Sequence, residues 1–325
     1  MILAAGYGTR LWPLTIDRAK PALPFMGRPL VGYVAEYLAR YGCRDIAVNL
    51  HHRPESVRAA LGDGGRFGVR LAYVEEPIIL GTGGALDNAR AFFADDEPFV
   101  VVNGKIATDI DLAAALRTHR ETGALATLVL RPNAVRERYS SVEVRGGLVR
   151  GFGAHPSPSD NAGDADAPLM FTGIQILEPR VFEFIPRGVF SHTTTDVYPQ
   201  AIARGEKIAA HVASGKWYEL STIPRYLDTS IALMRDEGRT VEIGEGASVE
   251  PGAAVSDAVL WEGARVEAGA RVRRAVLGAG VTARGGEVFE DVAVVRAELV
   301  RGSERPSKGL EGEPRGDNFV VKLPR

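Results

Sequence analysis

The sequence predicts an α/β fold, in which a Rossmann-like, doubly wound and mainly parallel sheet is followed by a short left-handed parallel β-helix. In the first two-thirds of the chain, strand-like segments alternate with helix-like ones over short connections, which is typical of a parallel sheet covered by helices. After residue 240, Gly and Val dominate, and apolar residues recur about every six positions. We therefore expect an α/β domain over 1–238, a hexapeptide-repeat β-helix over 239–300 and a partly disordered tail over 301–325.

The α/β part is expected to alternate strands and helices in the following order. Strands are predicted at 1–5, 45–50, 69–74, 99–102 and 126–130. Helices are predicted, from apolar spacing and from Pro and Gly at their ends, at 29–41, 54–61, 84–93 and 225–234. One more helix is expected to begin at a cap formed by Asp109 or Asp111 and to end at His119. Residues 155–168 are rich in Pro, Ser, Asp, Ala and Gly, which predicts a surface loop.

The repeat after residue 240 advances by six, six and then five residues. Its apolar positions are Ile243, Val249, Val255, Leu260, Val266, Val272 and Leu277. An antiparallel sheet would instead alternate with a period of two. Coils of this kind have edges that commonly need a partner, so a homo-oligomer is predicted. Within the charged tail, only residues 319–323 are expected to pack.

Composition excludes several classes of protein. The 39 Lys and Arg nearly balance the 41 Asp and Glu, for a formal charge of -2, so nucleic-acid and membrane partners are not expected. The single cysteine, Cys43, excludes an internal disulfide framework and a Cys-rich zinc site. No apolar run approaches the ~20 residues that span a bilayer, and no secretory signal precedes the first glycine motif. A cytoplasmic protein is therefore predicted.

The strongest motif follows the first strand and reads GYGTRLWPLT from Gly6, with KPALP from Lys20. Glycines after a strand let backbone N–H groups approach a phosphate without a clash with Cβ. Arg10 supplies a forked set of donors for phosphate oxygens, and Lys20 supplies a point charge for an α-phosphate. The dinucleotide fingerprint would need a third glycine where Leu11 stands, and no Gly-Lys-Ser/Thr of a P-loop occurs.

These residues resemble the sugar-1-phosphate nucleotidyltransferases, or sugar-nucleotide pyrophosphorylases. Their signature Gly-x-Gly-Thr-Arg-Leu-x-Pro-Leu-Thr and the following Pro-Lys-Pro match here, except that Ala19 replaces the first Pro. The resemblance continues through LGTGGA, NG, TGI and WYE over residues 1–235, and the hexapeptide segment resembles that of mannose-1-phosphate guanylyltransferase-like members. It implies that an NTP such as GTP and a sugar 1-phosphate give an NDP-sugar and pyrophosphate.

The resemblance also implies roles for individual residues. The triphosphate is expected on Gly6, Gly8, Thr9 and Arg10, with Lys20 at the α-phosphate. Asn103 is also expected to bind the nucleotide, whose base and ribose are expected near Gly83 and Gly84. The sugar is expected near Thr172 and Gly173.

Two further motifs depart from the family pattern. The family has an Asp that coordinates Mg²⁺ where this chain has Lys105, and the partner acidic position is Glu219, which is still able to bind a metal. The family's Glu-Lys-Pro, whose Lys contacts the sugar phosphate, is replaced by Ala154, His155 and Pro156. Mg²⁺ at the usual position is therefore doubtful.

Lys105 is one of only two lysines before position 207, so its place in the motif requires an explanation. Two unit charges 4 Å apart interact by about 4 kcal/mol at an effective dielectric constant near 20, so Lys in place of Asp repels a cation. Lys105 could contact the phosphates itself, Asp109 or Asp111 could become the metal ligand, or the site could bind without turnover; a structural lysine is the fourth reading. The sequence thus predicts a nucleotidyltransferase that uses Arg10, Lys20 and Lys105, or alternatively a catalytically impaired nucleotide-sugar-binding or regulatory subunit.

Overall fold

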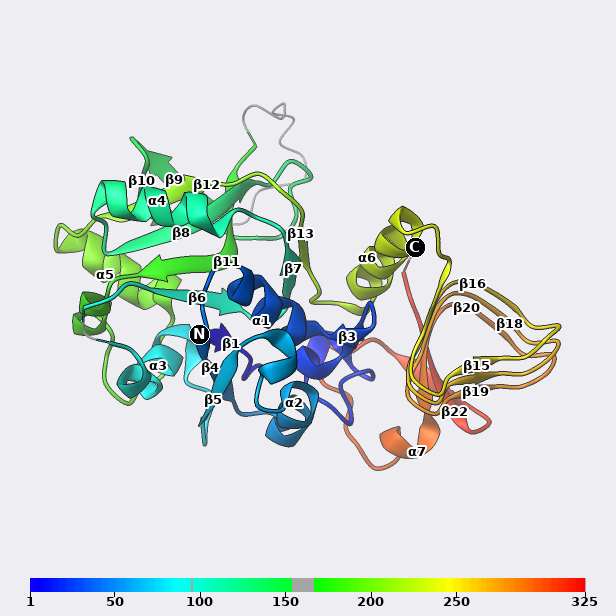
Figure 1. Ribbon diagram of the computed structural model, residues 1–325. Helices are drawn as coiled ribbons and strands as arrows, with labels where there is room; N and C mark the ends of the chain where they lie inside the picture. Colours follow the sequence, from blue (N-terminus) through cyan, green and yellow to red (C-terminus); the bar gives the residue numbers. More distant parts are fainter. Residues whose placement is uncertain (95, 154–166, 325) are drawn as a thin grey trace.

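The computed structural model describes residues 1–94, 96–153 and 167–324, so most of the predicted loop at 155–168, with His155, lies outside the described residues. Its largest sheet has nine strands. Their spatial order is β5 (Arg70–Glu75), β4 (Asp45–Leu50), β1 (Ile2–Leu3), β6 (Phe99–Asn103), β11 (Leu169–Leu177), β8 (Ala126–Pro132), β12 (Ile208–Val212), β10 (Leu148–Phe152) and β9 (Val142–Arg145). The sheet occupies one side of the molecule in Figure 1.

The sheet is rich in parallel strands but mixed. β5, β4, β1 and β6 run parallel, whereas β11 lies antiparallel between β6 and β8. β12 pairs parallel with β8, and β10 and β9 complete the sheet with antiparallel pairings. The parallel half is therefore the half that carries the glycine motif, because β1 leads directly into it.

Helices cover both faces of the sheet, as a doubly wound fold requires. Along β4, Ile46 and Val48 point into a core shared with α1 (Leu30–Arg40), α2 (Pro54–Leu61) and α4 (Leu112–Thr122). Ala47 points to the opposite core, which includes α3 (Gly81–Asn88) and α5 (Tyr198–Ala203). This alternation follows from the two-residue period of a strand, and it explains why the buried strands read as continuous apolar runs.

The structure decides between the two predicted caps of one helix and changes the bounds of another. Asp111, not Asp109, caps α4, since its Oδ1 accepts hydrogen bonds from the backbone N–H groups of Ala113 (2.9 Å) and Ala114 (3.2 Å). The helix predicted at 84–93 begins earlier, at Gly81, and ends at Asn88, followed by a 3₁₀ turn. Glycine has low helix propensity, so Gly81 and Gly83 did not indicate a helix in the sequence.

The segment after α6 (Ile223–Asp236) forms parallel coils stacked on one another (Figure 1). One face consists of β14 (Val241–Ile243), β16 (Ala254–Leu260), β18 (Arg271–Leu277) and β20 (Val288–Arg296), and another of β15 (Ser248–Val249), β17 (Arg265–Val266) and β19 (Thr282–Ala283). Val255 pairs with Val272, and Val272 pairs with Phe289, so each turn takes 17 residues. This spacing agrees with steps of six, six and five; that the coils form a left-handed hexapeptide β-helix stays a prediction.

The end of the chain packs more fully than its composition suggests. β21 (Gly312–Arg315) pairs with β22 (Asn318–Lys322), and β22 pairs antiparallel with β20. Phe319, Val321 and Leu323 are buried. The packing expected of residues 319–323 is present, and the unexpected addition is β21: the apolar run at the end of the tail covers the last coil and pairs with the open edge of β20.

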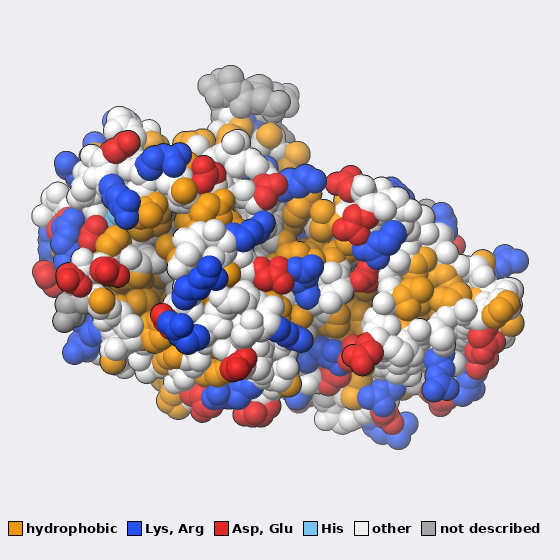
Figure 2. All heavy atoms as spheres, viewed as in Figure 1, with side chains coloured by type: hydrophobic (Ala, Val, Ile, Leu, Met, Phe, Trp, Pro, Cys, Tyr) orange, Lys and Arg blue, Asp and Glu red, His pale blue; other side chains and the backbone are white. Residues whose placement is uncertain are grey.

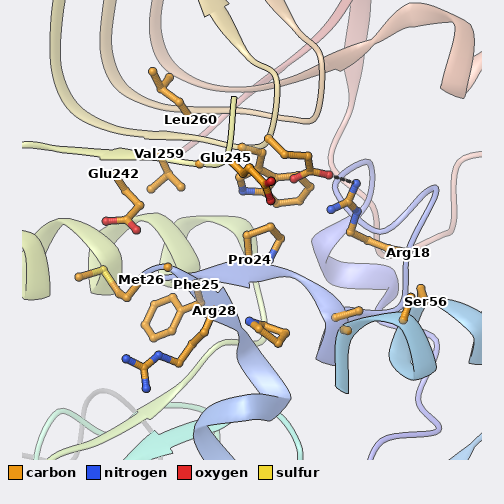
Figure 3. Close-up of a pocket in the computed structure, with 18 of the residues that line it drawn as sticks. Arg18, Pro24, Phe25, Met26, Arg28, Ser56, Glu242, Glu245, Val259 and Leu260 are labelled. Atoms are coloured by element: carbon orange, nitrogen blue, oxygen red, sulfur yellow. Dashed lines mark ion pairs between the residues drawn. The ribbon is translucent and has the colours of Figure 1, made fainter. Parts of the chain in front are cut away.

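The coils are joined to the α/β part by a shared apolar core. Leu11, Trp12 and Leu14 from the glycine motif meet α6, Trp261 and the coil strands in it. Beside this core lies a hollow of about 660 Å³, where Arg18 of the α/β part forms an ion pair with Glu262 of the coils (2.6 Å; Figure 3). Arg18 also lies over the Trp261 ring, 5.1 Å from its centroid.

The surface agrees with the balanced charge of the chain. Figure 2 shows Lys, Arg, Asp and Glu side chains interspersed over this face, with hydrophobic side chains gathered between the two parts and on the coils. Among the described helices, none is long and apolar enough to cross a bilayer.

Candidate functional site

The glycine motif and the turn after β6 leave the sheet at the same edge. β1 and β6 are parallel neighbours, and Leu3 is paired with Asn103, so both chains emerge side by side from the carboxyl ends of their strands. This is the edge at which sheets of this kind bind ligands. The glycine loop and the 103–105 turn therefore lie next to each other at this edge.

Gly8 shapes the loop. Its φ is 65°, a left-handed conformation that favours glycine, and a Cβ there would lie 3.0 Å from Cβ of Lys20 and 3.2 Å from Cγ2 of Thr15. Thr9 begins a 3₁₀ turn, Thr9–Leu11, which places Arg10 on the surface while Leu11 is buried. A Cβ on Gly6 would meet nothing within 4 Å, so the backbone there is open to a ligand.

Lys20 lies directly behind this loop, half-buried at the start of the 3₁₀ turn Lys20–Ala22. Burial, together with the positive charges of Lys105 and Arg10, lowers the pKa of Lys20 to about 7, although Glu219 acts in the opposite direction. The three predicted cations, Arg10, Lys20 and Lys105, therefore lie close enough to repel one another. A bound polyphosphate would relieve that repulsion.

Lys105 reaches the site beside Glu219. β7 (Ile106–Thr108) pairs antiparallel with β13 (Trp217–Glu219), and Ile106 is the partner of Glu219. Nζ of Lys105 donates a hydrogen bond to Oε1 of Glu219 and forms an ion pair with it. Two residues 114 positions apart in the chain are thus held together by this small sheet.

The second oxygen of Glu219 is also occupied. Oε2 accepts hydrogen bonds from the Tyr139 hydroxyl (2.7 Å), the Ser221 hydroxyl (2.8 Å) and the Arg225 guanidinium (3.2 Å). Burial alone would raise the pKa of Glu219, but the Lys105 charge and these hydrogen bonds outweigh it and lower the pKa to about 2. Glu219 is a buried, ionised carboxylate surrounded by donors.

Tyr139, Ser221 and Arg225 were not predicted from the sequence. Arg225 lies in the first turn of α6, six residues after Glu219, and this spacing was the only available signal for it. Tyr139 is 80 residues from Glu219, and nothing in its local sequence indicates that the two meet.

These residues do not fit a Mg²⁺ ion at the position where the family resemblance would place it. Among the described residues, no group of three or more His, Cys, Asp or Glu is arranged to hold a metal. Mg²⁺ needs oxygen ligands with free lone pairs; Oε2 of Glu219 already accepts from three donors, and Oε1 accepts from the Lys105 ammonium, which repels a cation beside it. Asp109 and Asp111 do not replace the missing carboxylate, because Asp109 accepts from the backbone N–H of Lys216 (2.6 Å) and Asp111 caps α4.

The structure places Gly173 against Asn103. Gly173 has a φ of 84°, and a Cβ there would lie 2.2 Å from Nδ2 of Asn103. The side chain of Thr172, in contrast, is buried, and its hydroxyl donates to the backbone oxygen of Val129 (2.8 Å). The Thr172 hydroxyl therefore stabilises the sheet, and any contact of this residue with a sugar must come from another atom.

Gly83 and Gly84 lie in α3, and a local packing contact explains why they are glycines. A Cβ on Gly83 would lie 2.6 Å from the Ser191 hydroxyl, and one on Gly84 would lie 2.6 Å from the backbone oxygen of Val189. The N–H of Gly83 also donates to the backbone oxygen of Ser191 (2.8 Å). Their predicted place near the base and ribose stays a prediction.

Comparison with known proteins decides the family. Residues 1–235 match the family model described as nucleotidyl transferase. The chain belongs to this family. A UTP–glucose-1-phosphate uridylyltransferase of Synechocystis is 33% identical over 266 residues, which cover 78% of this chain and 67% of that protein. A mannose-1-phosphate guanylyltransferase of Mycobacterium tuberculosis is 30% identical over 271 residues, which cover 78% of this chain and 72% of that protein.

A solved structure supports the fold independently. The crystal structure of HddC from Yersinia pseudotuberculosis has a TM-score of 0.61 and 22% identity, covering 71% of this nucleotidyltransferase and 97% of HddC. The family and its curated members confirm the prediction that the chain is an enzyme of the nucleotidyltransferase class.

Proposed function

We propose that this nucleotidyltransferase joins the nucleotidyl group of an NTP to a sugar 1-phosphate and releases pyrophosphate. In this reaction an oxygen of the sugar phosphate attacks the α-phosphorus, a new P–O bond forms, and the bond between the α-phosphorus and the pyrophosphate oxygen breaks. The observation that carries the proposal is the convergence of Arg10, Lys20 and Lys105 on the open glycine loop. The similarity to uridylyl- and guanylyltransferases of sugar 1-phosphates supports the choice of substrate class.

Arg10 and Lys20 have different roles in this proposal. Gly6, Gly8 and Thr9 present backbone to the triphosphate, and Arg10 binds its outer phosphates with a planar, forked guanidinium. Lys20 lies behind the loop, where an ammonium stabilises the charge that develops on the α-phosphate. Phosphoryl-type transfer requires positioning and charge neutralisation above all, which these residues provide.

Asn103 and Gly173 limit the space on the sugar side. Because a Cβ at residue 173 would overlap Nδ2 of Asn103, the glycine lets the amide lie flat against the sheet beside the site. A hollow of about 270 Å³ lined by Tyr139, Trp217 and Arg225 adjoins Glu219. We propose that the sugar phosphate enters from this side, with the Arg225 guanidinium at its border.

Pyrophosphate release over a panel of NTPs and sugar 1-phosphates tests this function. UTP and GTP with glucose 1-phosphate and mannose 1-phosphate are the first pairs, with the NDP-sugar confirmed by mass spectrometry. Lys20→Met should abolish release, whereas Lys207→Met, which removes an exposed charge just before β12, should not change it. No product with any pair, under conditions in which the nucleotide binds, would contradict the proposal.

One observation favours a second function, that of a nucleotide-sugar-binding or regulatory subunit. The Lys105–Glu219 pair occupies the place of the metal carboxylates, so a site that binds nucleotide without turnover would have this appearance. Binding without product formation in the panel would support it. The left-handed hexapeptide β-helix, the homo-oligomer and the cytoplasmic location stay predictions.

A further inference from the structure

We propose that Lys105 supplies the positive charge that a protein-held divalent cation would otherwise supply, so that this site binds and turns over its nucleotide without a metal ligated by residues 105 and 219. The inference rests on the proposed function, because it concerns how the same phosphates are neutralised. It takes the ligand to be a nucleoside triphosphate, and it assigns Lys105 direct contact with a phosphate oxygen.

The first argument is that both carboxylate oxygens of Glu219 already accept hydrogen bonds. Its two oxygens accept from Lys105 on one side and from Tyr139, Ser221 and Arg225 on the other. Oε2 already accepts three hydrogen bonds, and a metal on the remaining lone pair of Oε1 would lie beside the ammonium of Lys105. Mg²⁺ gives up its water ligands reluctantly, so an already hydrogen-bonded carboxylate next to a cation is a poor site for it.

The second argument is the availability of Lys105. Its side chain is 28% exposed, whereas that of Glu219 is 5% exposed, so the ammonium lies on the open side of the ion pair. An ammonium has three N–H donors, and the described residues receive a hydrogen bond from one of them, at Oε1 of Glu219. Glu219 therefore holds the ammonium in place and leaves donors for a ligand.

The third argument is the charge of the whole site. Glu219 faces Lys20 and Lys105, Arg10 adds a further cation, and Arg225 pairs with both Glu219 and Glu137 (2.7 Å), so these cations outnumber the two carboxylates. Such a surplus of positive charge attracts a polyphosphate and opposes a free divalent cation. Lys105 thus has the positive charge, the accessible ammonium and the fixed position that a phosphate-binding group needs.

Metal binding is tested first, without nucleotide and without a measurement of activity. Mn²⁺ serves as the probe, and electron paramagnetic resonance reports its free fraction. The native enzyme should bind no Mn²⁺ at this site, whereas Lys105→Asp should gain one Mn²⁺, which Lys105→Asp/Glu219→Gln should lose. A stoichiometric Mn²⁺ site in the native enzyme that Glu219→Gln removes would overturn the inference.

Nucleotide affinity is tested second, by calorimetry of the full chain with the productive NTP in EDTA and in Mg²⁺. The native enzyme should bind NTP in EDTA within about threefold of its affinity in Mg²⁺. Lys105→Met should weaken binding in EDTA by about 10- to 100-fold, the equivalent of one charge-assisted hydrogen bond, and Lys207→Met should not. Circular dichroism checks that each variant is folded.

The outcomes separate this inference from the proposed function. NTP binding in EDTA that Lys105→Met does not weaken would overturn the inference and leave the function intact. The inference would also be overturned if the native enzyme bound NTP only in Mg²⁺ and lost turnover in EDTA. An enzyme that binds NTP through Lys105 but forms no product with any sugar 1-phosphate would refute the proposed function while supporting the role of Lys105 in binding.

Discussion

Trp12 packs edge-on against Phe319, with 5.6 Å between the ring centroids and an interplanar angle of 69°. Trp12 follows Arg10 by two residues, and Phe319 lies in the last strand of the chain. The contact therefore connects the loop that is proposed to bind the triphosphate with the strand that closes the coil stack. The C-terminal segment supports the loop from behind.

Phe319→Ala should destabilise the enzyme and weaken nucleotide binding together. Truncation of a buried Phe typically costs about 3–5 kcal/mol, and Phe319 is 8% exposed, so a loss of about 3 kcal/mol in the free energy of unfolding is expected. Urea unfolding gives the free energy, and calorimetry with NTP gives the affinity. Val288→Ala, at a side chain that is 46% exposed on the same sheet, should cost less than about 1 kcal/mol and leave the affinity unchanged. Equal effects of the two variants would contradict the support role.

This contact also shows what the sequence could and could not predict. The coil spacing, the glycine loop and the 103–105 turn depend on patterns within a few residues, and the structure has all three. Phe319 lies at the end of a charged segment, and the sequence indicated that residues 319–323 pack but not that they pack on β20 and Trp12, which are distant in the chain. Long-range pairing, not local preference, orders that segment.

The same distinction applies to the site. Lys105 and Glu219 could each be singled out from a motif, but the sequence did not show that they pair, since β7 and β13 meet only in the folded chain. Tyr139 was missed for the same reason. Thr172 is the converse case: its motif suggested a sugar contact, which stays a prediction, and its hydroxyl donates to the backbone oxygen of Val129.

Nucleotide binding should take up a proton at about pH 8. The pKa of Lys20 is about 7 in the free enzyme, below the ordinary value of 10.5, so between these values Lys20 is largely neutral before binding. A bound phosphate favours the charged form and raises this pKa, so the proton comes from the buffer. Calorimetry in two buffers with different ionisation enthalpies measures the uptake, which should approach one proton. Lys20→Met should abolish it, and net release of protons by the native enzyme would contradict this assignment.

Glu219 should make stability depend on pH in the acid range. Its folded pKa of about 2 lies below the ordinary value of 4.5, so its stabilisation is fully present above pH 4.5 and is lost as the pH falls toward 2. The full contribution is on the order of 3 kcal/mol. Urea unfolding of the native enzyme and Glu219→Gln should therefore differ at pH 7 and converge below pH 4.5. Glu55→Gln, at an 85% exposed side chain, should follow the native curve throughout. A constant difference between native enzyme and Glu219→Gln across this range would show that the carboxylate charge is not responsible.

Gly173→Ala should impair the site more than an equivalent change elsewhere, because two effects act at residue 173. Alanine resists the φ of 84°, and its Cβ would fall 2.2 Å from Nδ2 of Asn103, so the amide must move. Gly146 is the matched control: its φ is 57°, and a Cβ there would meet nothing within 4 Å. Both variants should lose about 1–2 kcal/mol through the backbone.

Gly173→Ala and Gly146→Ala then differ in that only Gly173→Ala displaces the Asn103 amide. Gly173→Ala should raise the Kd for NTP or the KM for the sugar 1-phosphate by about tenfold, the equivalent of about 1.4 kcal/mol, whereas Gly146→Ala should leave both constants unchanged. Asn103→Ala tests whether the amide is responsible, because without the amide the methyl group added at residue 173 is no longer obstructed. If Asn103 acts as proposed, Asn103→Ala alone should raise the same constant, and adding Gly173→Ala should change it little further. Additive effects on that constant would mean that Gly173 acts on the ligand by a route that does not pass through Asn103.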